Sequence, residues 1–203
     1  MAARRRLLLL HGRNSSSEVS EMQAMLLGLE EVVSLSFLDA PHAAAKYDPS
    51  LSREGRSWLG ADDDLMASLR HVISHCKEHG PFDGAYGFSQ ACGLLALLSD
   101  PAVLSSMQVE TPLWKFVVCV CGTPQLMELQ NSPRLSLPIQ MPSFHLHGEK
   151  DAIRPDSIRL SESFADPIVR THPAGHSVPL EICQMTQLLG ELHSFIKEPR
   201  HTS

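Results

Sequence analysis

Long apolar runs, an excess of basic charge and a disulfide framework are all missing from this sequence of 203 residues. No stretch approaches the roughly 20 apolar residues that a helix needs to cross a bilayer, so the sequence predicts no membrane span. The 17 basic residues are outnumbered by 23 acidic ones. The one basic run, at residues 4–6, is typical of a solvated chain end. We therefore expect no nucleic-acid partner.

Features of secreted proteins are also sparse. Five cysteines, an odd number, lie mostly in apolar runs, which favours buried thiols over paired ones. The apolar run at residues 7–10 is shorter than the roughly 7–15 residues of a signal-peptide core. These absences predict a cytoplasmic protein without an export signal. With 43% hydrophobic residues and no repeat or linker, the chain is expected to form one domain over residues 1–203.

Short apolar runs alternate with segments of helical periodicity along the chain. Strands are expected at residues 7–10, 32–38, 82–88, 115–121, 142–147 and 167–171. Helices are expected at residues 19–29, 61–78, 90–98, 156–164 and 178–197, the first preceded by the capping-box spacing of Ser15 and Glu18. This alternation predicts an α/β fold, with a mainly parallel sheet covered by helices on both faces. The irregular segment 39–59 is long enough to form a lid. Apart from this segment, we expect a small cap or no cap over the sheet.

A nucleophile elbow is predicted where the third strand meets a helix. Gly87-Phe88-Ser89-Gln90-Ala91 follows the pattern G-x-S-x-G with alanine in the last position. The serine of such an elbow sits on a strained turn, so the residues two positions away must be small. Gly87 and Ala91 meet this requirement. The following helix directs its N-terminus at the site, which favours developing negative charge.

A serine nucleophile needs a base and an acid that orients the base, and in the α/β-hydrolase fold both come later in the chain. Asp151 follows the strand at 142–147, and His176 follows the strand at 167–171. Of the eleven histidines in the chain, the rivals to His176 that also follow Asp151 are His172, His193 and His201. Glu149 and Asp156 are rival acids, the first expected to be solvated and the second to cap a helix. The order and placement favour Ser89, Asp151 and His176.

The remaining parts of an ester-cleaving site are expected in the loops near Ser89. The backbone N–H groups of Gln90 and Arg13 are the predicted oxyanion donors, because one follows the nucleophile and the other follows the first strand. Gly12 would let that loop approach the site. Trp58 and Phe88 are candidates for substrate contact, although core packing is an equal alternative for both.

Several segments resemble one family. His11-Gly12 after the first strand, DAPH at residues 39–42, GFSQAC, HGEKD and HPAGHSVP occur in this order. They resemble the family serine hydrolase (FSH) group of α/β-hydrolases, which includes the ovarian-cancer-associated esterases, over residues 6–197. The resemblance implies a cytosolic serine esterase or thioesterase that acts on acyl esters without a cofactor. It assigns the catalytic roles to Ser89, Asp151 and His176, and Ala91 departs from the glycine often found in the family.

Other functions compete with the hydrolase. A protein of the same fold could bind a small molecule and act as a receptor with little turnover. His71, His75 and His79 repeat at helical spacing near Cys76, but a solvated helix face is the favoured interpretation and no metal is expected. Cys92 follows Ser89 on the helix, so it does not fit the role of nucleophile.

Overall fold

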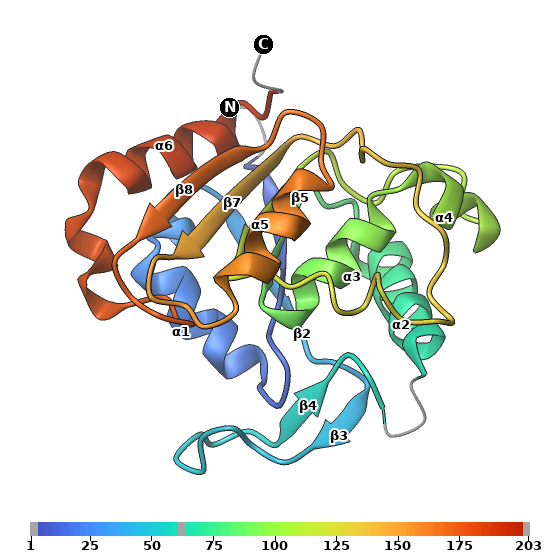
Figure 1. Ribbon diagram of the computed structural model, residues 1–203, viewed down its shortest axis with the longest axis horizontal. Coiled ribbons are helices and arrows are strands. Elements are labelled where there is room, and N and C mark those ends of the chain that lie inside the picture. The colour runs from blue at the N-terminus through green and yellow to red at the C-terminus, as the bar shows by residue number, and fades with distance from the viewer. Residues whose placement is uncertain (1–3, 61–63, 201–203) are drawn as a thin grey trace.

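The computed structural model describes residues 4–60 and 64–200. These residues are built around a six-stranded sheet, and Figure 1 shows how its strands and the helices are arranged. All neighbouring strands of this sheet are parallel, and their order is β2-β1-β5-β6-β7-β8. The strands are β1 (Arg6–Leu10), β2 (Ser34–Leu38), β5 (Gly84–Phe88), β6 (Val117–Val120), β7 (Ser143–Gly148) and β8 (Ile168–His172). The predicted α/β class with a mainly parallel sheet is therefore confirmed.

Helices cover both faces of the sheet, as predicted (Figure 1). One face packs against α2 (Leu65–His79), α3 (Gln90–Leu98), α4 (Pro101–Ser106) and α5 (Arg154–Glu162). The other face packs against α1 (Ser17–Leu26), α6 (Thr186–Lys197) and the 3₁₀ turns η1 (Leu29–Glu31) and η2 (Leu180–Gln184). In the described part of the chain, no helix is both long and apolar enough to cross a membrane.

The apolar run of β1 is explained by burial on both sides of the sheet. Leu8 and Leu10 belong to the core beneath α2 and α3, whereas Leu7 and Leu9 belong to the core beneath α1 and α6. All four are fully buried. A strand with helices on both faces has no polar side, so the run is continuous instead of alternating. Each buried leucine contributes about 1.5–3 kcal/mol relative to exposure.

Three local predictions are wrong. The segment 39–59, expected to be irregular, contains the antiparallel hairpin of β3 (His42–Ala44) and β4 (Gly55–Ser57). Its strands have three residues each, too short for a periodic pattern to show. The helix expected at residues 178–197 is divided into η2 and α6, because Met185 leaves the helical conformation between them. The helix expected from residue 61 begins at Leu65 with Asp64 as its cap, and residues 61–63 lie outside the described residues.

The predicted capping box at the start of α1 is also wrong. Ser16 occupies the N-cap position without a side-chain cap bond. The Glu18 carboxylate instead accepts hydrogen bonds from the backbone N–H groups of Ser52 and Arg53. The N–H of Ser17 is satisfied by the carboxylate of Asp39, at 2.6 Å. A residue distant in sequence thus supplies the cap, and local spacing could not reveal it.

Candidate active site

Ser89 occupies a sharp turn between β5 and α3. Its backbone has φ 55° and ψ −116°, a conformation that residues with a side chain rarely adopt. A Cβ atom added at Gly87 would lie 2.9 Å from a methyl group of Leu95 and 3.2 Å from the carbonyl carbon of Ala91. The N–H of Ser89 donates to the carbonyl of Val120 on the neighbouring strand, at 3.0 Å. The turn is held by the sheet and has room only for a small residue at position 87.

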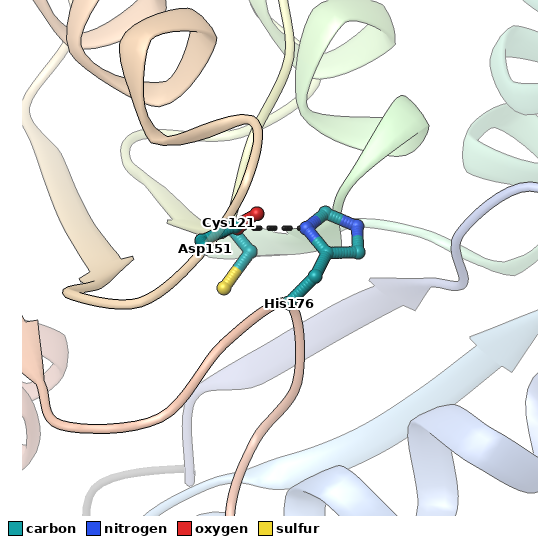
Figure 2. A group of neighbouring side chains, drawn as sticks. All are labelled: Cys121, Asp151 and His176. Atoms are coloured by element: carbon teal, nitrogen blue, oxygen red, sulfur yellow. Dashed lines mark hydrogen bonds and ion pairs between the residues drawn. The ribbon is translucent and has the colours of Figure 1, made fainter.

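The side chains of Ser89, His176 and Asp151 form a continuous hydrogen-bonded chain. Nε2 of His176 lies 2.8 Å from Oγ of Ser89. Nδ1 of His176 lies 2.7 Å from Oδ2 of Asp151, and Figure 2 shows this second contact. Oδ1 of Asp151 also accepts from the N–H of Ile153, at 2.9 Å, so both carboxylate oxygens are engaged. Because Asp151 can only accept, the neutral imidazole carries its proton on Nδ1 and presents a lone pair to the serine hydroxyl. This tautomer suits a base.

Parallel strands bring these three residues together from distant parts of the chain. Ser89 follows β5, Asp151 follows β7 and His176 follows β8, so all three lie beyond the carboxyl ends of their strands. The Asp151 side chain is buried, whereas 36% of the His176 side chain is exposed. Burial of the acid beneath the histidine holds the imidazole over the serine and leaves the serine side open to solvent.

The rival residues have other partners. His172 is buried, its Nδ1 accepts from the N–H of Ala174, and burial lowers its pKa. His193 contacts the carbonyl of Leu27 at 2.8 Å, and His201 lies outside the described residues.

The rival acids and the rival thiol are likewise engaged. Glu149 accepts from the hydroxyl of Thr171 at the surface, and Asp156 forms an ion pair with Arg159 inside the first turns of α5. The Cys92 thiol donates to the carbonyl of Gly87 at 3.1 Å, and burial raises its pKa well above the usual range. None of these groups is directed at Ser89 as His176 is.

A layer of buried polar contacts supports the loop that follows β1. Nε2 of His11 accepts from the N–H of Ala40 at 3.0 Å, so Nδ1 carries the proton and donates to the carbonyl of Gly12 at 2.7 Å. Burial lowers the pKa of His11, which favours this neutral form. Arg13, the predicted oxyanion donor, follows this pinned segment. From the sequence, His11 is expected only to belong to the turn that ends the first strand. Its hydrogen bonds to Ala40 and Gly12 were not predicted.

Trp58, a candidate for substrate contact, lies in the core, which is the alternative that the sequence left open. Its side chain is fully buried, and its indole N–H donates to the carbonyl of His11 at 2.6 Å. Its backbone N–H donates to Oε1 of Gln90 at 3.0 Å, and the hydroxyl of Ser57 donates to the same oxygen at 3.2 Å. The Gln90 side chain is therefore held in the core. These hydrogen bonds connect the end of the hairpin, the loop after β1 and the elbow at Ser89.

Two cavities meet at Ser89, and they differ in chemistry. Gly12, Arg13, Ser89 and His176 line a cavity of about 370 Å³ whose remaining wall is mainly apolar: Val19, Met22, Leu26, Tyr47, Phe88 and Val178, with Ser15, Gln23 and Ser177. Arg13, Ser89 and His176 also line a second cavity of about 490 Å³. Its other residues are mainly polar: Gln90, Thr123, Gln125, Glu128, Asp151 and Asp156, with Ala152 and Ile153. Gly12 and Phe88 thus lie at the apolar side, and Gln90 at the polar side.

Cys121 lies directly beneath the hydrogen bond between Asp151 and His176 (Figure 2). It follows β6, has φ 47° and is fully buried. Burial raises the pKa of its thiol to about 12, so the sulfur is protonated at neutral pH. The sequence suggested only that this cysteine is buried, and its position against the two other side chains was not predicted.

Comparisons with known proteins identify the family of the chain. A family model described as serine hydrolase (FSH1) matches residues 1–187. The human protein named Esterase OVCA2 is 34% identical over 134 residues, which cover 64% of this chain and 58% of that protein. An esterase of Anopheles gambiae is 31% identical over 199 residues, covering 87% of this chain and 72% of that protein.

Solved structures extend the comparison to the fold. A Bacillus cereus carboxylesterase aligns with a TM-score of 0.62 at 16% identity, covering 93% of this chain and 88% of that one. Identity this low supports the fold alone, and that fold is the α/β-hydrolase fold. Because the family model spans most of the sequence, the chain belongs to the FSH1 serine hydrolase family.

Proposed function

We propose that this protein hydrolyses carboxylic esters or thioesters through Ser89, His176 and Asp151, with an acyl group held covalently on the serine. The observation that carries the proposal is the chain of short contacts from Ser89 through His176 to Asp151, at 2.8 and 2.7 Å. A serine hydroxyl becomes a nucleophile when a positioned base removes its proton. The carboxylate of Asp151 would stabilise the imidazolium that forms.

The proposed reaction has two halves. Oγ of Ser89 attacks the acyl carbon while Nε2 of His176 takes the hydroxyl proton, and the same nitrogen then returns that proton to the departing alcohol or thiol. A water molecule attacks the acyl-serine in the second half, again with His176 as base. The backbone N–H groups of Gln90 and Arg13 are the proposed donors to the oxyanion. The N-terminus of α3 adds to the stabilisation of negative charge at this place.

Labelling with a fluorophosphonate tests the nucleophile directly. The wild-type protein is expected to be labelled covalently, because the probe reacts with activated serine hydroxyls. Ser89→Ala should not react. Equal labelling of both proteins would remove Ser89 from the mechanism. If the wild-type protein is labelled but releases p-nitrophenol from a short p-nitrophenyl ester only very slowly, a receptor with little turnover is favoured instead.

The two cavities indicate how a substrate would lie. An acyl chain fits the apolar cavity beside Met22 and Phe88, because burial there removes its methylene groups from water. A polar leaving group fits the second cavity, where Thr123 and Gln125 offer hydrogen bonds. We therefore propose that the apolar part of a substrate lies on the acyl side of the ester and the polar part on the alcohol or thiol side.

A pair of isomeric esters separates this orientation from its reverse. Ethyl octanoate and octyl acetate have the same atoms, but the long chain is on the acyl side in the first and on the alcohol side in the second. We expect kcat/KM to be about tenfold or more higher for ethyl octanoate, because burying even two further methylene groups is worth about 1.6 kcal/mol. A preference for octyl acetate would reverse the proposed orientation.

Two methionines on α1 provide a matched control for this preference. Met22 lines the apolar cavity and is 50% exposed, whereas Met25 does not line it and is 64% exposed. Met22→Glu should reduce the preference for ethyl octanoate, because it places a charge in the acyl cavity. Met25→Glu introduces the same charge on the same helix and should keep the wild-type preference.

A further inference from the structure

The geometry points to a thiophilic metal site formed by Cys121, Asp151 and His176, where an ion such as Cd²⁺ or Zn²⁺ binds and switches the hydrolase off. The inhibitory consequence rests on the proposed function, whereas the binding itself does not. One ligand atom from each of the three side chains lies within 4.8 Å of the other two. The set combines a sulfur, a carboxylate oxygen and an imidazole nitrogen, which are the ligand types that Zn²⁺ takes in proteins.

The three ligand atoms need only small movements to reach bonding distance. Zinc bonds are about 2.3 Å long to sulfur and about 2.0–2.2 Å long to nitrogen or oxygen. Tetrahedral ligands at these distances stand roughly 3–4 Å apart. Nδ1 of His176 and Oδ2 of Asp151, now 2.7 Å apart, would have to separate slightly to admit an ion between them. The exposed His176 side chain covers the two buried ligands, so rotation of that side chain opens the way in.

One side chain donates toward the sulfur of Cys121, whereas burial and the nearby Asp151 carboxylate raise the pKa of its thiol in the absence of a metal. The N–H of Ala174 donates to Nδ1 of His172 at 3.3 Å, so the neutral ring carries its proton on Nε2. That nitrogen lies 3.7 Å from Sγ of Cys121 and directs its N–H at the sulfur. Hydrogen bonds of this outer kind orient the ligands of a metal site and tune the bound metal. Hard ions such as Mg²⁺ gain nothing from sulfur and are not expected here.

Binding would change the role of His176 without changing its number of protons. The metal takes the Nδ1 lone pair, so the proton of the neutral ring moves to Nε2. Cys121 loses its proton to solvent and becomes a thiolate, and Asp151 remains a carboxylate. Nε2 then donates toward Ser89 instead of accepting from it. The serine loses its base, and ester hydrolysis stops while the metal remains bound.

Cd²⁺ titration followed by ultraviolet absorbance tests the site without any catalysis. A bond between Cd²⁺ and a thiolate produces a charge-transfer band. The background protein carries Ser89→Ala, which removes the nucleophile, and Cys183→Ala, which removes an exposed thiol. We expect one Cd²⁺ per chain with the band in this background and no band after Cys121→Ala is added. A band of equal strength without Cys121 would overturn the proposal.

Inhibition of ester hydrolysis provides the second measurement. In the Cys183→Ala protein, Cd²⁺ should abolish turnover reversibly, with activity restored by a chelator, and Mg²⁺ should have no effect. Adding Cys121→Ala should raise the Cd²⁺ concentration for half inhibition by about tenfold or more relative to that variant's own rate, because a direct ligand is lost. An unchanged midpoint would place the inhibitory ion on exposed His176 alone and refute the three-ligand site.

A second variant keeps the proposal testable if Cys121→Ala does not fold. Asp151→Asn, in the background lacking Ser89 and Cys183, removes the carboxylate ligand and should weaken Cd²⁺ binding by the same order. Undiminished binding in that variant would also refute the site. A charge-transfer band in the Ser89→Ala/Cys183→Ala background, together with no ester hydrolysis by the Cys183→Ala protein, would retain the metal site and reject the proposed function. Turnover without a band would do the reverse.

Discussion

Replacing Ser89 with alanine is expected to lower kcat for ester hydrolysis by about 10⁴–10⁶-fold. Nε2 of His176 lies 2.8 Å from the hydroxyl of Ser89. Removing that hydroxyl leaves the base without a nucleophile to activate. Some rate above that in water should remain, because the proposed oxyanion donors are backbone groups that the substitution leaves in place. Steady-state kinetics with a p-nitrophenyl ester measure the change.

Two controls separate loss of catalysis from loss of the folded structure. Alanine keeps the Cβ atom, and the turn at position 89 is held through its backbone by Val120, so the unfolding free energy should stay close to that of wild type. Ser74→Ala removes a hydroxyl from the exposed side of α2, where it donates to Glu78, and should leave kcat unchanged. If Ser89→Ala kept more than about one-hundredth of the wild-type kcat, another group would have to be the nucleophile.

Stability should fall steeply as the pH drops below about 6.5, the usual pKa of histidine. His145 and His147 project from β7 into the interior, and burial lowers their pKa values to about 3 and about 4. Within the described residues, Nε2 of each ring is buried without a hydrogen-bond partner. His147 also faces Arg154, which lowers its pKa further, and Asp151, which opposes that effect. Both rings are therefore neutral in the folded protein at mildly acidic pH.

The direction of the effect follows from the unfolded chain. Below pH 6.5 the unfolded chain binds a proton on each histidine, whereas the folded protein does not until the pH approaches 4 or 3, so acid favours unfolding. For His145 alone the loss between pH 7.5 and pH 5 is about 2 kcal/mol. Urea unfolding at a series of pH values measures it. The loss should be largest between pH 6.5 and pH 4.

Two variants check the assignment to His145. His145→Leu replaces the ring with an apolar side chain, and the difference in unfolding free energy between pH 7.5 and pH 5 should shrink by about 2 kcal/mol. His79→Gln replaces a histidine of α2 whose side chain is 57% exposed, and it should leave the difference as in wild type. A pH dependence that is the same in His145→Leu and in wild type would assign the acid sensitivity to other groups.

The positions of the site residues could be predicted because the relevant constraints are local or topological. The elbow at Ser89 is recognisable from the small residues on either side of it. In a parallel sheet, residues that follow different strands meet at one edge, so the order of Ser89, Asp151 and His176 along the chain was informative. The expected places of these residues, after β5, β7 and β8, are the places where the structure has them.

What could not be predicted depends on partners distant in sequence. The cap of α1 comes from Asp39, and the strands of the hairpin pair with each other across the segment that was expected to be irregular. Trp58 is apolar and near the site in sequence, so contact with substrate and burial in the core were equal alternatives. The hydrogen bond from its indole to His11 decides for the core. The neighbours of Cys121 could not be predicted, because Asp151 and His176 follow two other strands, β7 and β8.

The bonds that Gln90 makes to Ser57 and Trp58 have a consequence for protein engineering. Chimaeras that exchange residues 40–60 between relatives, in order to transplant substrate preference, would also replace the Ser57 hydroxyl and the backbone segment that carries the Trp58 N–H, the two donors that hold this glutamine. The backbone beside the nucleophile would then lose part of its scaffold. A drop in rate in such a chimaera would reflect a disturbed elbow before it reflected a new specificity. A graft that carries Ser57 and Trp58 with it avoids this confusion.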